Sequence, residues 1–130
     1  MNYQIADFII RMKNAAASKR KSAVVSYTKM NMQVANILVK YGFLQNVQEE
    51  TQGRKKVLVA TIAYVDRTPV FTGVKIVSKP SLRVYTKAQR ATKQSKKVAG
   101  VSILSTNIGI ISDQEAKEKG VGGELLFTIW

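Results

Sequence analysis

The chain contains no cysteine and no histidine among its 130 residues. Without cysteine no disulfide can form, so nothing points to an oxidising compartment. The usual cysteine and histidine ligands of zinc are missing too, and we expect neither a metal site nor a cofactor. The lack of histidine also removes the side chain that most often acts as a general base near neutral pH.

Acidic residues are scarce. Only 8 aspartates and glutamates face 21 lysines and arginines, which gives a net charge of +13. No acid occurs between residues 8 and 48, or between residues 67 and 112. Segments of this kind repel themselves unless a polyanion neutralises them. A solvated basic surface is the simpler alternative, but ordinary surfaces mix both signs, so we favour a nucleic-acid partner.

Long apolar runs are also missing. None approaches the roughly 20 residues that span a bilayer. The first residues place Asp7 before their basic cluster and do not match a secretory signal. A membrane surface would require an amphipathic helix with a free apolar face, whereas both predicted helices use theirs for the core. We expect an intracellular protein without a membrane partner; an organellar location stays open.

The few carboxylates give little support to an enzyme. Glu49 and Glu50 are adjacent on a predicted strand and would point to opposite faces. The glycine-rich segment 120–123 lacks the Lys-Ser/Thr pair of a phosphate-binding loop. Glu124 is the best remaining candidate, and its simpler role is to pair with a nearby lysine or with backbone amides. We therefore predict that the protein is not an enzyme.

Hydrophobic periodicity predicts an α+β fold of two small packed domains, residues 1–66 and 67–130. The first runs helix-strand-helix-strand-strand, with Thr28 capping its second helix and Gly42 ending it. Its expected elements are 4–16, 23–27, a helix after Thr28, 43–49 and 56–64. The second is rich in strands, expected at 70–77, 82–87, 101–104 and 124–130. Its short helix follows Ser112 and stops at Gly120; residues 66–69 form a linker or tight connection and 88–97 an exposed basic loop.

Small polar residues interrupt the apolar stretch LSTNIGIIS, residues 104–112. RNA is read through shape, hydroxyl and phosphate contacts, and stacking of unpaired bases. Ser105, Thr106 and Asn107 supply compact donors and acceptors, and Gly109 permits close backbone approach. Tyr85 lies in the basic segment LRVYTK, where a base could stack on it. A tight turn is the alternative interpretation, but the net charge favours RNA binding.

The segment GVSILSTNIGIISDQEAKEKGVGGELLFTIW, residues 100–130, resembles the C-terminal motif of the small-subunit ribosomal protein S-eight family. IADFIIRMKNA at 5–15 and TKMNMQVANILVKYGFL at 28–44 resemble its two N-terminal helices. SKPSLRVY at 78–85 is similar to its Ser-[Lys/Arg]-Pro-Gly-x-Arg-x-Tyr segment. The resemblance covers nearly the whole chain, and its motifs occur in the family's order.

The resemblance implies a structural protein that binds the central domain of small-subunit ribosomal RNA and helps to assemble the platform. Its other partners would be neighbouring ribosomal proteins and, in some bacteria, its own messenger RNA. Its location would be the ribosome of the cytoplasm or of an organelle. A free-standing RNA chaperone or messenger regulator is the alternative function.

The family's hydroxyl-bearing loop falls on Ser105, Thr106 and Gly109, and its aromatic contact on Tyr85. The sequence departs from the family pattern at four positions, namely Ser81, Val98, Asn107 and Ile108. The candidate RNA-binding residues are Arg11, Asn14, Lys29, Arg83, Tyr85, Lys87, Ser105, Thr106, Asn107, Gly109, Gly122, Gly123 and Glu124.

Overall fold

The computed structural model describes residues 2–78, 83–86 and 100–130. Within these residues the chain forms three helices and antiparallel sheets, which confirms the predicted α+β class. Contacts divide the chain into two compact units, one spanning Gln4–Phe71 and the other containing Thr72–Trp130. The predicted domain boundary after residue 66 stays a prediction.

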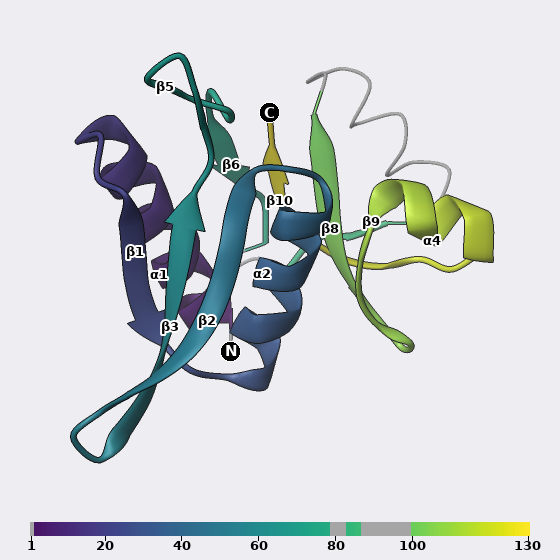
Figure 1. Ribbon diagram of the computed structural model, residues 1–130. Coiled ribbons are helices and arrows are strands. Elements are labelled where there is room, and N and C mark those ends of the chain that lie inside the picture. The colour runs from purple at the N-terminus through teal and green to yellow at the C-terminus, as the bar shows by residue number, and fades with distance from the viewer. Residues whose placement is uncertain (1, 79–82, 87–99) are drawn as a thin grey trace. The chain divides into compact units, whose positions relative to one another are not determined.

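The first unit contains two helices and a three-stranded antiparallel sheet, in the predicted order of elements (Figure 1). Strand β3 lies at the centre, between β1 and β2. The ends of these elements differ from the predicted ends by a few residues. Their bounds are α1 Asn2–Ala17, β1 Ser22–Ser26, α2 Lys29–Lys40, β2 Leu44–Gln52 and β3 Lys55–Ile62.

The core of this unit follows the predicted periodicities. The apolar stripe of α1 is at most 3% exposed, and its members are Ile5, Phe8, Ile9 and Met12. On β3, buried residues alternate with half-buried ones, so one face of the sheet is covered and the other is more open. Thr28 caps α2 as predicted, because its Oγ1 accepts a hydrogen bond of 2.9 Å from the amide of Asn31. Gly42, with φ of 82°, takes the predicted left-handed conformation after the helix.

A small hairpin closes the first unit. Strands β4 (Tyr64–Val65) and β5 (Thr68–Pro69) pair with each other, Tyr64 opposite Pro69. The two turn residues, Asp66 and Arg67, have φ of 50° and 66°, the positive values that a two-residue hairpin turn requires. The predicted linker or tight connection is therefore a tight connection.

The second unit is built around one strand, β10. Strand β8 pairs along one edge of β10, while β6 and β7 pair in succession along the other edge. Strand β9 completes the sheet by pairing with β8. The bounds are β6 Val74–Ile76, β7 Tyr85–Thr86, β8 Val101–Thr106, β9 Gly109–Ser112, α4 Asp113–Lys119 and β10 Gly123–Ile129.

Two predicted strands are shorter in the structure. The strand predicted at 70–77 is confined to Val74–Ile76. On either side of this strand, two consecutive backbone amides donate to the same carbonyl of the neighbouring segment. Thr72 and Gly73 both donate to the carbonyl of Trp130, and Val77 and Ser78 both donate to that of Leu126. Such sharing breaks the alternating ladder. Of the strand predicted at 82–87, the described residues retain Tyr85–Thr86. The predicted basic loop at 88–97 lies outside the described residues.

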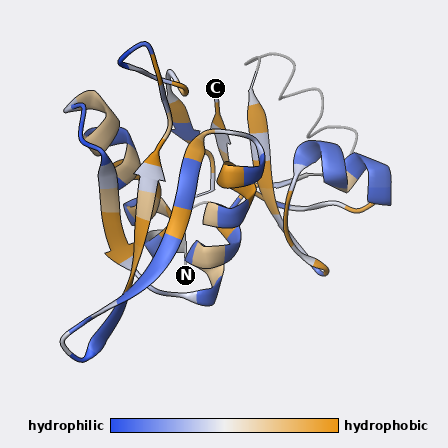
Figure 2. Ribbon diagram, in the orientation of Figure 1, coloured by the Kyte–Doolittle hydropathy of each residue, from blue (hydrophilic) through white to orange (hydrophobic). Residues whose placement is uncertain are grey.

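Helix α4 covers a buried cluster on one face of this sheet. The cluster consists of Leu104, Ile111, Leu125 and, from α4, Ala116. Ser112 caps the helix as predicted, since its Oγ accepts a 3.2 Å bond from the amide of Glu115. Figure 2 shows that most of α4 is hydrophilic, as expected for a short helix that buries a single face.

The substitution Leu104→Ala should lower the free energy of unfolding by about 2–5 kcal/mol, because it leaves a cavity between β8 and α4. Chemical denaturation measures this. Ile108→Ala is the matched control in the same hairpin: Ile108 is 51% exposed, so the change should stay within about 0.5 kcal/mol. Equal losses in the two variants would contradict the described packing of the hairpin.

Candidate nucleic-acid interface

The stretch that interrupts the apolar pattern forms a hairpin. Ser105 and Thr106 are the last residues of β8, so the expectation that they lie in a loop is corrected. The turn itself consists of Asn107 and Ile108, and Thr106 pairs with Gly109 to close it. Gly109 has φ of 123°, which glycine adopts far more readily than other residues. The turn therefore accounts for a glycine at this position, while the close approach to RNA predicted for Gly109 stays a prediction.

The hydroxyl of Thr106 stabilises this turn. It donates a 2.8 Å hydrogen bond to the carbonyl of Gly109 and accepts a 3.3 Å bond from the amide of Ile108. Asn107 and Ile108 are exposed, whereas Ser105, Thr106 and Gly109 are half-buried. The tip of the hairpin is therefore accessible to a partner, and the hydroxyl of Thr106 stabilises its conformation.

Four residues form a row across the sheet. Glu124 on β10 pairs with Tyr85 on one side and with Ser105 on the other, and Ser105 pairs with Ile110 on β9. Directly opposed residues of antiparallel strands point to the same face. We call Tyr85, Glu124, Ser105 and Ile110 the cross-strand row. It brings together residues that are distant in sequence, and Tyr85 is 71% exposed at one end.

Arg83 adds a positive charge beside the row. Its Nη1 lies 3.4 Å from Oε2 of Glu124, and the two side chains are 35% and 13% exposed. Arg83 and Tyr85 are two positions apart in an extended segment, so they point to the same side. Glu124 was predicted, in its simpler role, to pair with a nearby lysine or with backbone amides. The structure shows an ion pair, and its partner is an arginine. This pairing offsets the one negative charge of the row.

Ser78 is a positioning residue that the sequence analysis missed. Its Oγ accepts a 2.9 Å hydrogen bond from the amide of Val84 and donates a 3.3 Å bond to the carbonyl of the same residue. Ser78 is 2% exposed, and the carbonyl of Val84 also accepts a 2.8 Å bond from the amide of Leu125. These bonds hold the segment that carries Arg83 and Tyr85 against β10. The only feature of the sequence that pointed to Ser78 was its position at the start of the motif SKPSLRVY.

Gly123 contributes through close packing of strands. A Cβ atom at this position would lie 2.2 Å from the carbonyl oxygen of Ser105 and 3.0 Å from Cγ2 of Thr106. A side chain there would push β10 away from β8. Gly122, the preceding candidate, is exposed and lies just before the strand.

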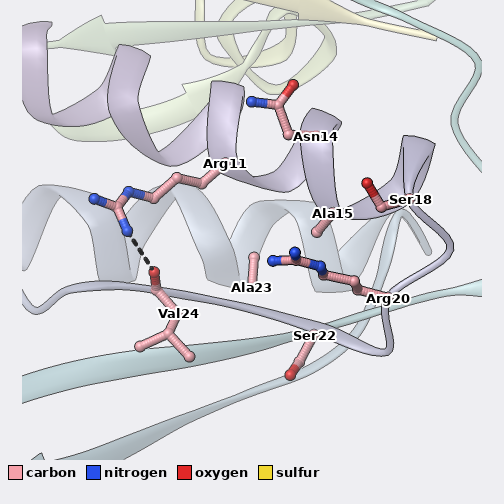
Figure 3. A pocket seen from close by; sticks show the side chains of 8 residues that line it. All are labelled: Arg11, Asn14, Ala15, Ser18, Arg20, Ser22, Ala23 and Val24. Atoms are coloured by element: carbon pink, nitrogen blue, oxygen red, sulfur yellow. Dashed lines mark hydrogen bonds between the residues drawn. The ribbon is translucent and has the colours of Figure 1, made fainter.

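The remaining candidates within the described residues belong to the first unit. Arg11 and Asn14 on α1 line a pocket of the first unit, which also includes Arg20 (Figure 3). Lys29 is exposed at the first position of α2 and is not among the lining residues. Lys87 lies outside the described residues. The described candidates therefore form a C-terminal group around the row and a pair at the pocket, Arg11 and Asn14, while Lys29 belongs to neither group.

Residues 2–78, 83–86 and 100–130 contain no cluster of three or more histidine, cysteine, aspartate or glutamate side chains able to hold an ion. In the same part of the chain, no helix has the length and hydrophobicity needed to cross a membrane.

Comparison with known proteins places the chain in a class, the ribosomal proteins. It belongs to the ribosomal protein S8 family, which matches residues 3–130. Small ribosomal subunit protein uS8 of Synechocystis sp. is 37% identical over 128 residues, 97% of this chain and 96% of the relative. Its counterpart in Ruminiclostridium cellulolyticum is 35% identical, covering 97% and 95%. Protein uS8c of Rhodomonas salina is 35% identical, covering 100% and 99%.

Membership of this family confirms the resemblance that the C-terminal motif predicted. It also confirms that the protein is not an enzyme, because the family consists of structural proteins. The roles of the individual candidate residues stay predictions.

Replacing Ser78 with Ala should release Val84 and loosen the segment of Arg83 and Tyr85. We expect faster hydrogen exchange at the Val84 amide and a loss of about 1–3 kcal/mol in the free energy of unfolding, since buried polar groups lose their partner. Ser102→Ala is the control: its buried hydroxyl lies 3.0 Å from Oγ1 of Thr128 in the same sheet. If both variants change Val84 exchange equally, Ser78 has no local positioning role.

Proposed function

We propose that the protein is a structural component of the small ribosomal subunit that binds the central domain of its RNA and helps to assemble and stabilise the platform. Support comes from relatives named as small ribosomal subunit proteins and from the net charge of +13. Neighbouring ribosomal proteins are further partners. The site of action is the ribosome, and relatives include both uS8 and uS8c forms.

The observation that carries this proposal is the cross-strand row with its hairpin. A hydroxyl group, an aromatic ring and a guanidinium group share one face, contributed by Ser105, Tyr85 and Arg83. RNA minor grooves display 2′-hydroxyls that small polar groups can contact, and an unpaired base can stack on an exposed ring. The row therefore supplies the groups that shape-dependent RNA recognition requires.

Basic residues outside the row supply most of the affinity in this proposal. Each contact with a phosphate releases counterions and makes binding depend steeply on salt. The acid-free segments lack carboxylates that would oppose such contacts. Selection of the binding site then rests on the row, while affinity rests on total positive charge.

Sedimentation in high salt distinguishes a ribosomal component from a free-standing RNA chaperone or messenger regulator. A ribosomal component stays with small subunits, whereas a chaperone is washed off. Repression of its own messenger would use the same row, on an RNA segment of similar shape, and a substitution in the row would weaken both interactions in parallel.

Ser105→Ala should weaken binding to the central domain of small-subunit RNA about fivefold, the cost of one hydrogen bond, and leave folding intact. Filter binding with transcribed Synechocystis RNA measures this. Ser26→Ala, an exposed serine of the other unit, is the control and should bind normally. Unchanged binding by Ser105→Ala would mean that the row does not select RNA.

Thr106 acts differently, because its hydroxyl already holds the turn. We expect Thr106→Ala to weaken RNA binding and also to lower thermal stability, while Thr106→Ser keeps the hydroxyl and both properties. If Thr106→Ala retains full stability, the two hydrogen bonds to Gly109 and Ile108 do not stabilise the hairpin.

The Tyr85 ring should contribute by stacking on a base. Tyr85→Ala should weaken RNA binding by about 1–3 kcal/mol, and Tyr85→Phe should bind almost as the parent protein does. The same filter-binding assay measures both variants. Loss in Tyr85→Phe as large as in Tyr85→Ala would assign the contact to the hydroxyl and reject stacking.

A further inference from the structure

The first unit contains a polar pocket between the end of α1 and β1. Its volume is about 420 Å³, and its lining includes two arginines, an asparagine and two serines. Figure 3 shows Arg11 and Asn14 on α1, and Arg20 beyond the helix with its side chain extending back toward Ala23. Arg11 and Asn14 are candidates predicted from the sequence, and the fold brings Arg20 into the same pocket.

Backbone contacts fix the position of Arg20. Lys19 adopts a left-handed conformation, with φ of 56°, and the chain turns back after α1. The Arg20 amide donates a 2.8 Å bond to the carbonyl of Ala15, and the Arg20 carbonyl accepts a hydrogen bond from the hydroxyl of Tyr64. Both backbone groups of Arg20 are therefore held in place.

Arg11 is oriented from the opposite end of the pocket. Its Nε lies 3.0 Å from Oδ2 of Asp7, one helical turn earlier, and its Nη1 donates a 3.4 Å bond to the carbonyl of Val24. The ion pair is solvent-exposed and therefore weak, and the bond to Val24 brings the guanidinium to β1. Between the two arginines the walls are small, formed by Ala15 and Ala23.

The size and chemistry of the pocket select a class of ligand. Guanidinium groups bind phosphate oxygens, and an asparagine amide can pair with the N6 and N7 edge of adenine. A volume of 420 Å³ falls within the range of small-ligand sites, about 300–1,000 Å³, and exceeds what a phosphate group alone would fill. Alanine walls leave room for a flat ring.

We propose that this pocket holds one unpaired nucleotide of the bound RNA, with its phosphate against Arg20 and Arg11 and an adenine base against Asn14. This proposal rests on the proposed function, because the nucleotide belongs to the ribosomal RNA. It concerns a different unit from the cross-strand row, so the two sites can be tested separately.

The test is a double-mutant cycle between protein and RNA. Unpaired nucleotides of the Synechocystis central-domain RNA are replaced one at a time by abasic residues, and each RNA is titrated with the parent protein and with Asn14→Ala. At one adenosine, removal of the base should weaken the parent protein about tenfold and have no further effect on Asn14→Ala. The coupling should persist in Ser105→Ala, which disturbs only the row.

Salt dependence tests the phosphate contact. Arg20→Ala should reduce the slope of log K against log salt by about 0.7, the value for one phosphate of a single strand. Lys13→Ala is the matched control: it removes an equal charge from an exposed position of α1 that does not line the pocket.

Two results would overturn the proposal. One is that the losses of binding free energy caused by Asn14→Ala and by each abasic substitution simply add. The other is an equal change of slope in Arg20→Ala and Lys13→Ala, which would make the arginine part of a diffuse positive surface. If the parent protein does not select this RNA at all, the proposed function fails as well.

Discussion

The pairing of Glu124 with two strands at once is the constraint on which the C-terminal site depends. Tyr85 and Ser105 are not close in sequence, and each reaches the shared face because it lies opposite the same residue of β10. This register requires β8 and β10 to approach closely next to Gly123. The site is therefore a property of the sheet, and the exposed tip of the hairpin is only one part of it.

Net charge and fixed hydrogen bonds contribute differently to binding in the proposed function. The excess of 21 basic over 8 acidic residues gives a general attraction to polyanions but cannot choose among them. Selecting one polyanion requires side chains that are held at fixed positions. Hydrogen bonds that are buried or made to the backbone hold them there. Ser78 fixes the segment of Arg83, and the hydroxyl of Tyr64 fixes the backbone of Arg20.

Most of the fold could be predicted because local signals agreed with long-range packing. Thr28, Ser112 and Gly120 mark helix ends whose chemistry is contained in a few neighbouring residues. The short extent of β6 could not be predicted, since it depends on carbonyls of Leu126 and Trp130 at the far end of the chain. The roles of Ser78 and Arg20 were missed for the same reason: their hydrogen-bond partners are set by tertiary structure. Thr106 was predicted to contact RNA, and its hydrogen bonds within the turn were not foreseen.

Strand β10 follows all four of its sheet partners and neighbours in sequence, which has a consequence for biosynthesis. Strands β6 to β9 emerge from the translating ribosome before the strand that joins them. Until residues 123–129 have emerged, Tyr85 and Ser105 have no common neighbour to align them. A nascent chain can thus complete the first unit early, but the cross-strand row of the second unit forms only after β10 has emerged.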